Sequence, residues 1–171
     1  VYAGPDGWWA ALAGGGLMRY DAARKVWMRE GKLAGEAAVL ATSQAKANAR
    51  ATRPAAARSR NASVTAGPTL GWVISDMAFS ATHWFAASEH GLLVSENRGR
   101  SWGLLPLGPL ADLPVSSVRV SQDGKSLWAV SLRGLVFSSD AGRTWSWRDL
   151  PLDAGGALRL DIARGESDSD T

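Results

Sequence analysis

The chain has 171 residues, of which 46% are hydrophobic and 20% charged, a composition that argues against a wholly disordered protein. It has no cysteine and only two histidines, which excludes disulfides and thiolate metal sites and leaves few other metal ligands, so we expect no metal ion and no other cofactor. No stretch reaches the roughly 18 apolar residues that a membrane-spanning helix needs, so we expect no transmembrane segment.

The net charge of +3 comes from one part of the chain, residues 35–66. This stretch contains five basic residues and one acid, so the rest of the chain carries a net charge of −1. Its basic residues are Lys46, Arg50, Arg53, Arg58 and Arg60. Because the rest of the chain is not basic, the overall charge gives little support to a nucleic-acid-binding protein, and we do not expect nucleic acid as a partner.

Three segments of the chain align with one another without gaps. They read GWWAALAGGGLMRYDAARKVW, THWFAASEHGLLVSENRGRSW and KSLWAVSLRGLVFSSDAGRTW, and they start at residues 7, 82 and 125. Their final residues, Trp27, Trp102 and Trp145, are separated by 75 and 43 residues. A repeat of about 40–45 residues made of short strands has the length of one β-propeller blade.

The predicted elements follow from this repeat in chain order. Residues 1–34 form a blade that lacks its start, 35–66 an Ala/Arg-rich insertion, 67–110 a second blade, 111–152 a third, 153–164 the first strand of a further blade, and 165–171 an acidic tail. The insertion forms either a short helix from about Glu36 to Arg50 or a flexible loop, because its apolar positions make only a weak stripe.

The pattern within each unit predicts an all-β fold of four antiparallel strands per blade. Val118 and Val120 alternate with polar neighbours, and Asp123-Gly124 is a strong hairpin signal. Since propellers have four to eight blades, three blades do not close a ring. We therefore expect further propeller blades from the same chain or from another chain.

The segment between the third and fourth strands carries a motif. SSDAGRTW fits the pattern Ser-x-Asp-x-Gly-x-Thr-Trp residue for residue, and SENRGRSW fits it with Asn97 for the aspartate and Ser101 for the threonine. This motif resembles the Asp-box (BNR) repeat of β-propellers, and the chain is most similar to the photosystem II stability/assembly factor-like propellers. The resemblance implies a non-catalytic scaffold or assembly factor that binds a protein partner, in an extracytoplasmic (periplasmic or secreted) location.

The residue types of the motif also have a structural explanation. A carboxylate or amide in a tight turn accepts backbone N–H groups, glycine tolerates the positive φ of the turn, and tryptophan buries ring area between sheets. We therefore expect these residues to close turns and fill the core rather than to form a catalytic site. They are Ser95, Asn97, Gly99, Ser101, Trp102, Ser138, Asp140, Gly142, Thr144 and Trp145. The first unit keeps Trp27 but lacks the motif. We therefore expect that no side chain caps its turn by accepting backbone N–H groups.

The turns between the second and third strands are the best candidates for a partner surface. Alternation of turns places them at the same end of the blades as the connections between blades, from which the insertion emerges. Loops on a rigid scaffold commonly carry function. The candidate partner-binding residues are Glu89, His90, Arg133, Arg50, Arg53, Arg58 and Arg60, and the arginines of the insertion could bind an anionic ligand.

Two alternative functions stay open from the sequence. One is a glycoside hydrolase or sialidase-like enzyme, since related propellers include such enzymes. Sialidase chemistry needs an activated tyrosine and only Tyr2 and Tyr20 are present, and no pair of facing carboxylates stands out, so we favour a protein without enzymatic activity. The other is a sugar-binding propeller that uses exposed Trp8, Trp72 or Trp147.

Overall fold

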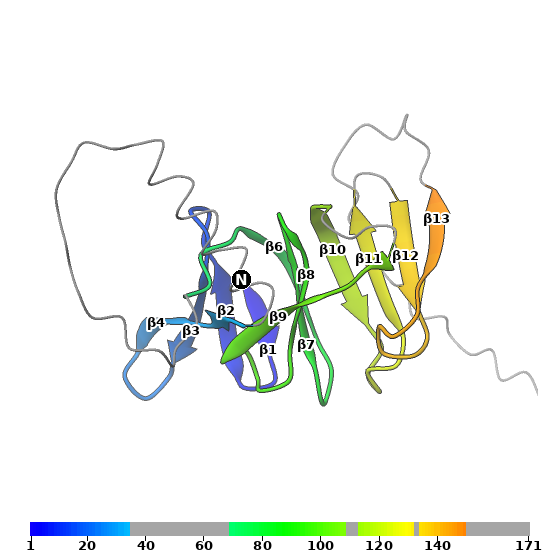
Figure 1. Cartoon of the computed structure of the whole chain (residues 1–171). Coiled ribbons are helices and arrows are strands. Elements are labelled where there is room, and N and C mark those ends of the chain that lie inside the picture. Colours follow the sequence, from blue (N-terminus) through cyan, green and yellow to red (C-terminus); the bar gives the residue numbers. More distant parts are fainter. Residues whose placement is uncertain (35–68, 109–112, 132–133, 150–171) are drawn as a thin grey trace, which may run out of the picture.

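The computed structural model describes residues 1–34, 69–108, 113–131 and 134–149 (Figure 1). The predicted insertion, the strand predicted at 153–164, the acidic tail and Arg133 lie outside these residues. The described residues form three antiparallel sheets in chain order, and no helix among them is long and apolar enough to cross a membrane. The prediction of an all-β fold built from four-stranded blades is confirmed.

Each sheet is a meander of four strands. The first contains β1 (Tyr2–Gly4), β2 (Gly7–Ala11), β3 (Leu17–Asp21) and β4 (Val26–Glu30). The second contains β6 (Ile74–Phe79), β7 (Trp84–Ser88), β8 (Gly91–Ser95) and β9 (Ser101–Leu105), with the short β5 (Lys32–Leu33) added parallel to β9. The third contains β10 (Val115–Val120), β11 (Leu127–Ser131), β12 (Gly134–Ser138) and β13 (Ser146–Asp149).

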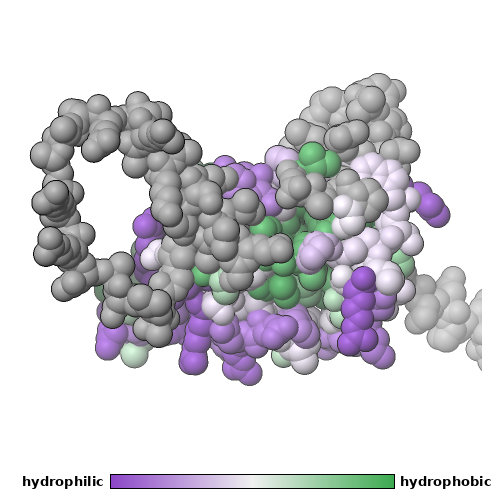
Figure 2. Space-filling view, viewed as in Figure 1, coloured by the Kyte–Doolittle hydropathy of each residue, from purple (hydrophilic) through white to green (hydrophobic). Residues whose placement is uncertain are grey.

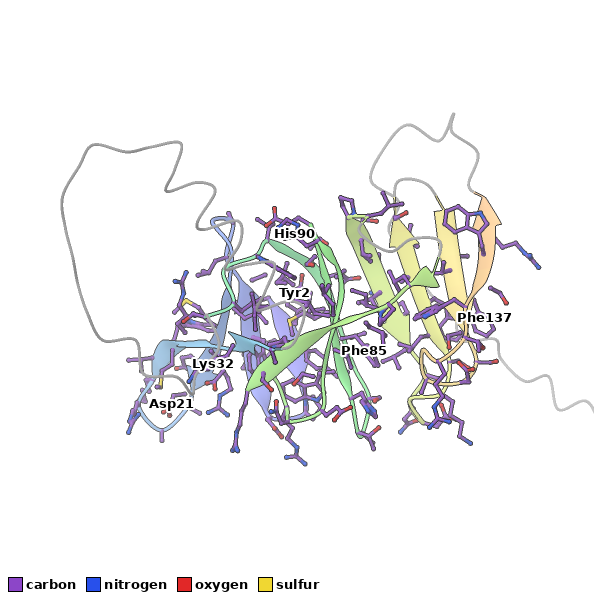
Figure 3. The ribbon with its side chains drawn as sticks, viewed as in Figure 1. Tyr2, Asp21, Lys32, Phe85, His90 and Phe137 are labelled. Carbon is purple, nitrogen blue, oxygen red and sulfur yellow. The ribbon has the colours of Figure 1, made fainter. Side chains whose placement is uncertain are left out.

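The sheets pack face to face, so the second sheet is covered on both faces. The sheets are numbered in chain order. We call the face of a sheet that points toward the sheet before it in the chain its preceding face, and the opposite face its following face. Side chains alternate along a strand, and in β7 Trp84 and Ala86 join the core shared with the first sheet, whereas Phe85 and Ala87 join the core shared with the third. Figure 3 places Phe85 between the second and third sheets.

One feature of the repeat alignment is wrong in the first sheet. Without a gap, Trp9 aligns with Trp84, yet Ala11 pairs with Leu17 across a five-residue turn, whereas the equivalent pair Ala87 and Leu92 has four residues between. The extra residue shifts β2 by one position, and a one-residue shift moves every side chain to the other face. Trp9 therefore lies on the following face, where its ring meets Trp84 edge-on at 5.3 Å.

The β2–β3 turn fixes the first sheet against the chain that leads into β6. The Gly16 N–H donates to the Trp72 carbonyl at 2.8 Å. A Cβ on Gly15, whose φ is +88°, would lie 1.9 Å from the Gly71 carbonyl oxygen. Only glycine permits this approach, because any side chain would collide with backbone.

The two flanks of the 35–68 segment lie together on the outer edge of the second sheet. The Ala34 N–H donates to the Trp102 carbonyl, and Lys32 forms an isolated bridge with Thr69. Residues 70–73 then lead toward the end of the sheet that carries the β7–β8 turn, where the Glu89 N–H donates to the Val73 carbonyl. The chain thus leaves and rejoins the described fold at one place.

Candidate functional site

The β12–β13 turn is closed by its own polar side chains. Asp140 accepts hydrogen bonds from the Thr144 hydroxyl at 2.6 Å and from the backbone N–H groups of Thr144 and Arg143 at 2.9 and 3.1 Å. Ser138 accepts the Gly142 N–H at 2.8 Å and donates to Asp140. These donors, with the Thr144 hydroxyl foremost, lower the pKa of Asp140 from its ordinary 3.8 to about 2.

The β8–β9 turn reproduces this arrangement with an amide. The Asn97 side-chain oxygen accepts the Ser101 N–H at 2.8 Å, and its nitrogen donates to the Ser101 hydroxyl at 2.7 Å. Ser95 accepts the Gly99 N–H at 2.8 Å, as Ser138 does in the third sheet. The Trp102 indole donates to the Gly99 carbonyl at 2.9 Å. An amide can therefore replace the carboxylate as an acceptor, because the turn needs hydrogen bonds rather than charge.

The β3–β4 turn of the first sheet does have a cap, contrary to expectation. Asp21 accepts the backbone N–H groups of Ala23 and Arg24, both at 3.0 Å. Asp21 stands one residue after the position that aligns with Ser95 and Ser138, so the motif did not reveal it. The sequence does contain a sign of this cap, because an aspartate at the start of a turn commonly accepts the backbone N–H of the residue two positions later.

The tryptophans that end the three units differ in burial. Trp102 is fully buried, Trp145 is half-buried, and Trp27 is 40% exposed. All three lie on the preceding face, and among the described residues no sheet covers that face of the first blade. Trp27 therefore does not lie in a core between two described sheets, whereas Trp102 does. Of the tryptophans considered for sugar binding, Trp72 is buried, Trp147 is half-buried, and only Trp8 is largely exposed.

Glu89 and His90 form the β7–β8 turn and hold the chain that enters β6. One Glu89 carboxylate oxygen accepts the Val73 N–H at 3.1 Å and lies 3.7 Å from His90 Nε2, and the His90 ring packs edge-on against Trp72 at 4.6 Å. Figure 3 shows His90 at the end of the blades opposite to Asp21. The two residues thus have a structural task, while Glu89 keeps 44% of its side chain exposed.

An apolar hollow of about 270 Å³ lies beside Glu89, where the second and third sheets meet. Its lining is Val73, Ser75, Glu89, Pro114, Val115 and Ser116. Val73 is 38% exposed, a high value for a valine whose backbone is held at both N–H and C=O. The sequence pattern indicated Glu89 but not the hollow, because the walls of the hollow come from separate parts of the chain, such as Ser75 and Val115.

Two more hollows are polar. One, of about 430 Å³, lies between the first two sheets near the β8–β9 turn, where Arg98 pairs with Asp6 at 3.1 Å. The other, of about 440 Å³, lies along the innermost strands β1, β6 and β10. There the buried Asp76 accepts the Arg119 guanidinium at 2.6 Å, and also the Ser117 hydroxyl and the Val118 N–H, which joins β6 to β10. The described residues contain no group of three or more metal-ligating side chains.

The remaining candidate residues, Arg50, Arg53, Arg58, Arg60 and Arg133, lie outside the described part of the chain. The prediction that the arginines of the insertion bind an anionic ligand therefore stays a prediction.

Comparison with known proteins gives one relevant finding. No family model matches the chain, and no curated protein matches it. Among solved structures, the chain is similar to that of YCF48 bound to D1 peptide, with a TM-score of 0.47 and 13% identity, over 81% of this chain. The match covers 36% of that protein, so the chain spans about a third of its length.

Proposed function

We propose that this chain is a non-catalytic scaffold of the Asp-box propeller class, similar to the assembly-factor propellers, that binds an extended segment of a protein partner at the end of the blades carrying the β7–β8 turn. The observation that carries the proposal is the apolar hollow beside Glu89, with the exposed Val73 on its wall. We further propose an extracytoplasmic location. We also propose that the arginines of residues 35–66 bind anionic groups of the partner.

The chemistry of the hollow indicates what the segment contains. Val73, Pro114 and Val115 offer aliphatic surface for one apolar side chain, and burying such a side chain favours binding by about 1.5–3 kcal/mol. One oxygen of the Glu89 carboxylate accepts the Val73 N–H, and 44% of the Glu89 side chain is exposed at the rim of the hollow. A basic residue beside the apolar residue in the partner would complement this carboxylate.

The opposite end of the blades is a weaker candidate. The acceptors Asp21, Asn97, Asp140 and Asp123 there each bind backbone N–H groups of their own turns. Figure 2 shows hydrophilic residues along this end. Acceptors that already have hydrogen-bond partners within the chain gain little free energy from binding another protein. The polar groups at this end therefore stabilise the turns.

A peptide selection tests the proposal. Short random peptides displayed on phage are selected on the purified chain, and the affinity of the best peptides is then measured for two variants. We expect Val73→Glu to weaken binding at least about tenfold, which corresponds to roughly 1.4 kcal/mol. Arg143→Ala, at the opposite end, is the matched control and should leave the affinity unchanged.

Two outcomes would overturn the proposal. Peptides that bind Val73→Glu as tightly as the unaltered chain would place the binding surface elsewhere. Hydrolysis of glycosides, including sialosides, by the purified chain would show an enzyme, and a variant without Glu89 would then reveal whether the same end carries that activity.

A further inference from the structure

The polar hollow between the first and second sheets, near the β8–β9 turn, is lined by charged side chains from both sheets. Its volume of about 430 Å³ lies within the range of small-molecule sites, about 300–1,000 Å³. Three arginines line it, Arg19, Arg98 and Arg100, together with three acids, Asp6, Glu30 and Glu96. The proposed peptide site lies at the other end of the blades and uses none of these residues.

Arg19 stands at a position that is apolar in the next sheet. It lies opposite Trp9 in its strand pair, as Val94 lies opposite Phe85 in the second sheet. Val94 packs against the core that the second and third sheets share. The Arg19 side chain is instead 43% exposed at the hollow. An arginine thus takes a place that the repeat gives to an aliphatic side chain.

Glu30 shows the same exchange on the neighbouring strand. It lies opposite Leu17, as Leu105 lies opposite Leu92. Leu105 packs against the second core and the β12–β13 turn, where a Cβ on Gly142 would lie 3.0 Å from it. Apolar side chains therefore close the space between the second and third sheets, whereas charged ones border a hollow between the first and second. Such a departure from the apolar pattern of a fold costs stability and is typical of functional sites.

The arginines of the hollow have hydrogen-bond donors to spare. A guanidinium carries five N–H donors. Arg98 uses one nitrogen, Nη1, for both carboxylate oxygens of Asp6, at 3.1 and 3.4 Å. Arg19 Nε lies 3.7 Å from Glu30, which is too far for a hydrogen bond. The Arg100 guanidinium has no hydrogen bond or ion pair with any residue that the structure describes. The hollow therefore offers free donors, whereas the acceptors of the nearby turns are already used.

We propose that this hollow binds a small molecule through a carboxylate group, with Arg19, Arg98 and Arg100 as the donors. A planar carboxylate matches the planar guanidinium and accepts two parallel N–H bonds from it. The acidic side chains of the lining disfavour a multiply charged anion such as phosphate, because like charges repel one another at short distance. The ligand is therefore a carboxylate of single charge.

A titration of the full chain with sodium acetate, followed by heteronuclear NMR, gives the first test. Sodium chloride keeps the ionic strength constant, because exposed charges respond to salt. The Nε–H signals of Arg19, Arg98 and Arg100 should shift along a saturable curve in acetate and not in chloride alone. Arg143 is the internal control, because it holds the position of Arg100 in the β12–β13 turn and lies outside the hollow, so its signal should not follow that curve.

Substitutions at these two matched positions test the role of the guanidinium. Both side chains are exposed, so the fold should tolerate the changes. Arg100→Gln should weaken acetate binding at least about fivefold, because a charge-assisted hydrogen bond is lost. Arg143→Gln should leave the affinity unchanged. Arg100→Lys keeps the charge but not the planar pair of donors, so it should weaken binding nearly as much as Arg100→Gln.

Filling the hollow gives an independent test. The double variant Arg19→Val with Glu30→Leu introduces the apolar pair found at these positions in the second sheet. It should lose the saturable response to acetate and melt at a higher temperature than the unaltered chain, because apolar side chains then fill the space between the sheets. Circular dichroism shows whether its sheets have formed. If they have not, Arg100→Gln decides the proposal.

Four results would overturn the proposal. Linear shifts of equal size at Arg100 and Arg143 would show only a response to salt. Saturable binding of sodium phosphate without binding of acetate would contradict a carboxylate ligand. Full affinity in Arg100→Lys would contradict recognition by a planar pair of donors, and full affinity in the double variant would place the site elsewhere. None of these results affects the peptide site, which Val73→Glu tests separately.

Discussion

Trp102 and Trp27 occupy the same place in two sheets of one chain, and their environments differ completely. Trp102 is fully buried and donates its indole N–H to the Gly99 carbonyl. Trp27 is 40% exposed, and its ring packs against Tyr20 at 5.3 Å on an uncovered face. The strand that carries each residue is similar, so the neighbouring sheet decides the burial of the ring.

The same contrast holds for the contacts between the sheets. The second and third sheets are joined by the buried pair of Asp76 and Arg119, whereas the first and second are joined by Asp6 and Arg98, of which Arg98 is 70% exposed. The contribution of a residue to the stability of this fold therefore depends on whether a neighbouring sheet buries it.

Replacing Trp102 with alanine should have the largest effect on stability. We expect a loss of about 3–5 kcal/mol in the free energy of unfolding, because the substitution leaves a cavity between two sheets. Trp27→Ala should lose less than about 1 kcal/mol, because Trp27 is 40% exposed and no described sheet covers its ring. Urea unfolding followed by circular dichroism measures both. Equal losses would show that the neighbouring sheet does not decide how much each ring contributes to stability.

Removing Asp76 should have the next largest effect. Asp76→Ala leaves the Arg119 guanidinium without its carboxylate in a largely buried place, which costs about 3 kcal/mol. Asp6→Ala removes the partner of an exposed arginine and should cost less than about 1 kcal/mol. The two variants are compared by urea unfolding. A small loss for Asp76→Ala would show that the second and third sheets are held by their apolar core alone.

Gly15 gives a third comparison, with Gly14 beside it. A Cβ on Gly15 would collide with the Gly71 carbonyl, whereas a Cβ on Gly14 has no atom within 4 Å. Gly15→Ala should therefore lose about 2 kcal/mol through backbone strain, and Gly14→Ala should be close to neutral. A thermal melt of both variants measures the difference. If Gly15→Ala melts like the unaltered chain, the first sheet does not depend on this turn.

The sequence reveals the parts of this fold that repeat. Three aligned tryptophans and two Ser-x-Asp/Asn-x-Gly turns are enough to predict four-stranded blades, because each feature has a local physical cause. The features that were missed depend on contacts between distant residues. The shift of β2 follows from one extra residue in a glycine-rich turn, which a gap-free alignment hides. The hollow beside Glu89 and the Asp76–Arg119 pair each join residues from separate sheets, and no local pattern marks them.

The smallest expected effect compares Asp140 with Asn97, which close equivalent turns with and without a titrating group. The pKa of Asp140 is about 2 in the folded chain, below its ordinary 3.8, so its contribution to stability is complete above pH 3.8 and is lost as the pH falls through about 2. Asp140→Asn should therefore melt at a temperature that differs least from that of the unaltered chain in acid and most at neutral pH. Thr144→Val removes the hydroxyl that contributes most to the lowered pKa, so an NMR titration of that variant should find the pKa of Asp140 shifted back toward 3.8. An unchanged titration midpoint would mean that the backbone N–H groups of the turn and the Ser138 hydroxyl hold the carboxylate without the Thr144 hydroxyl.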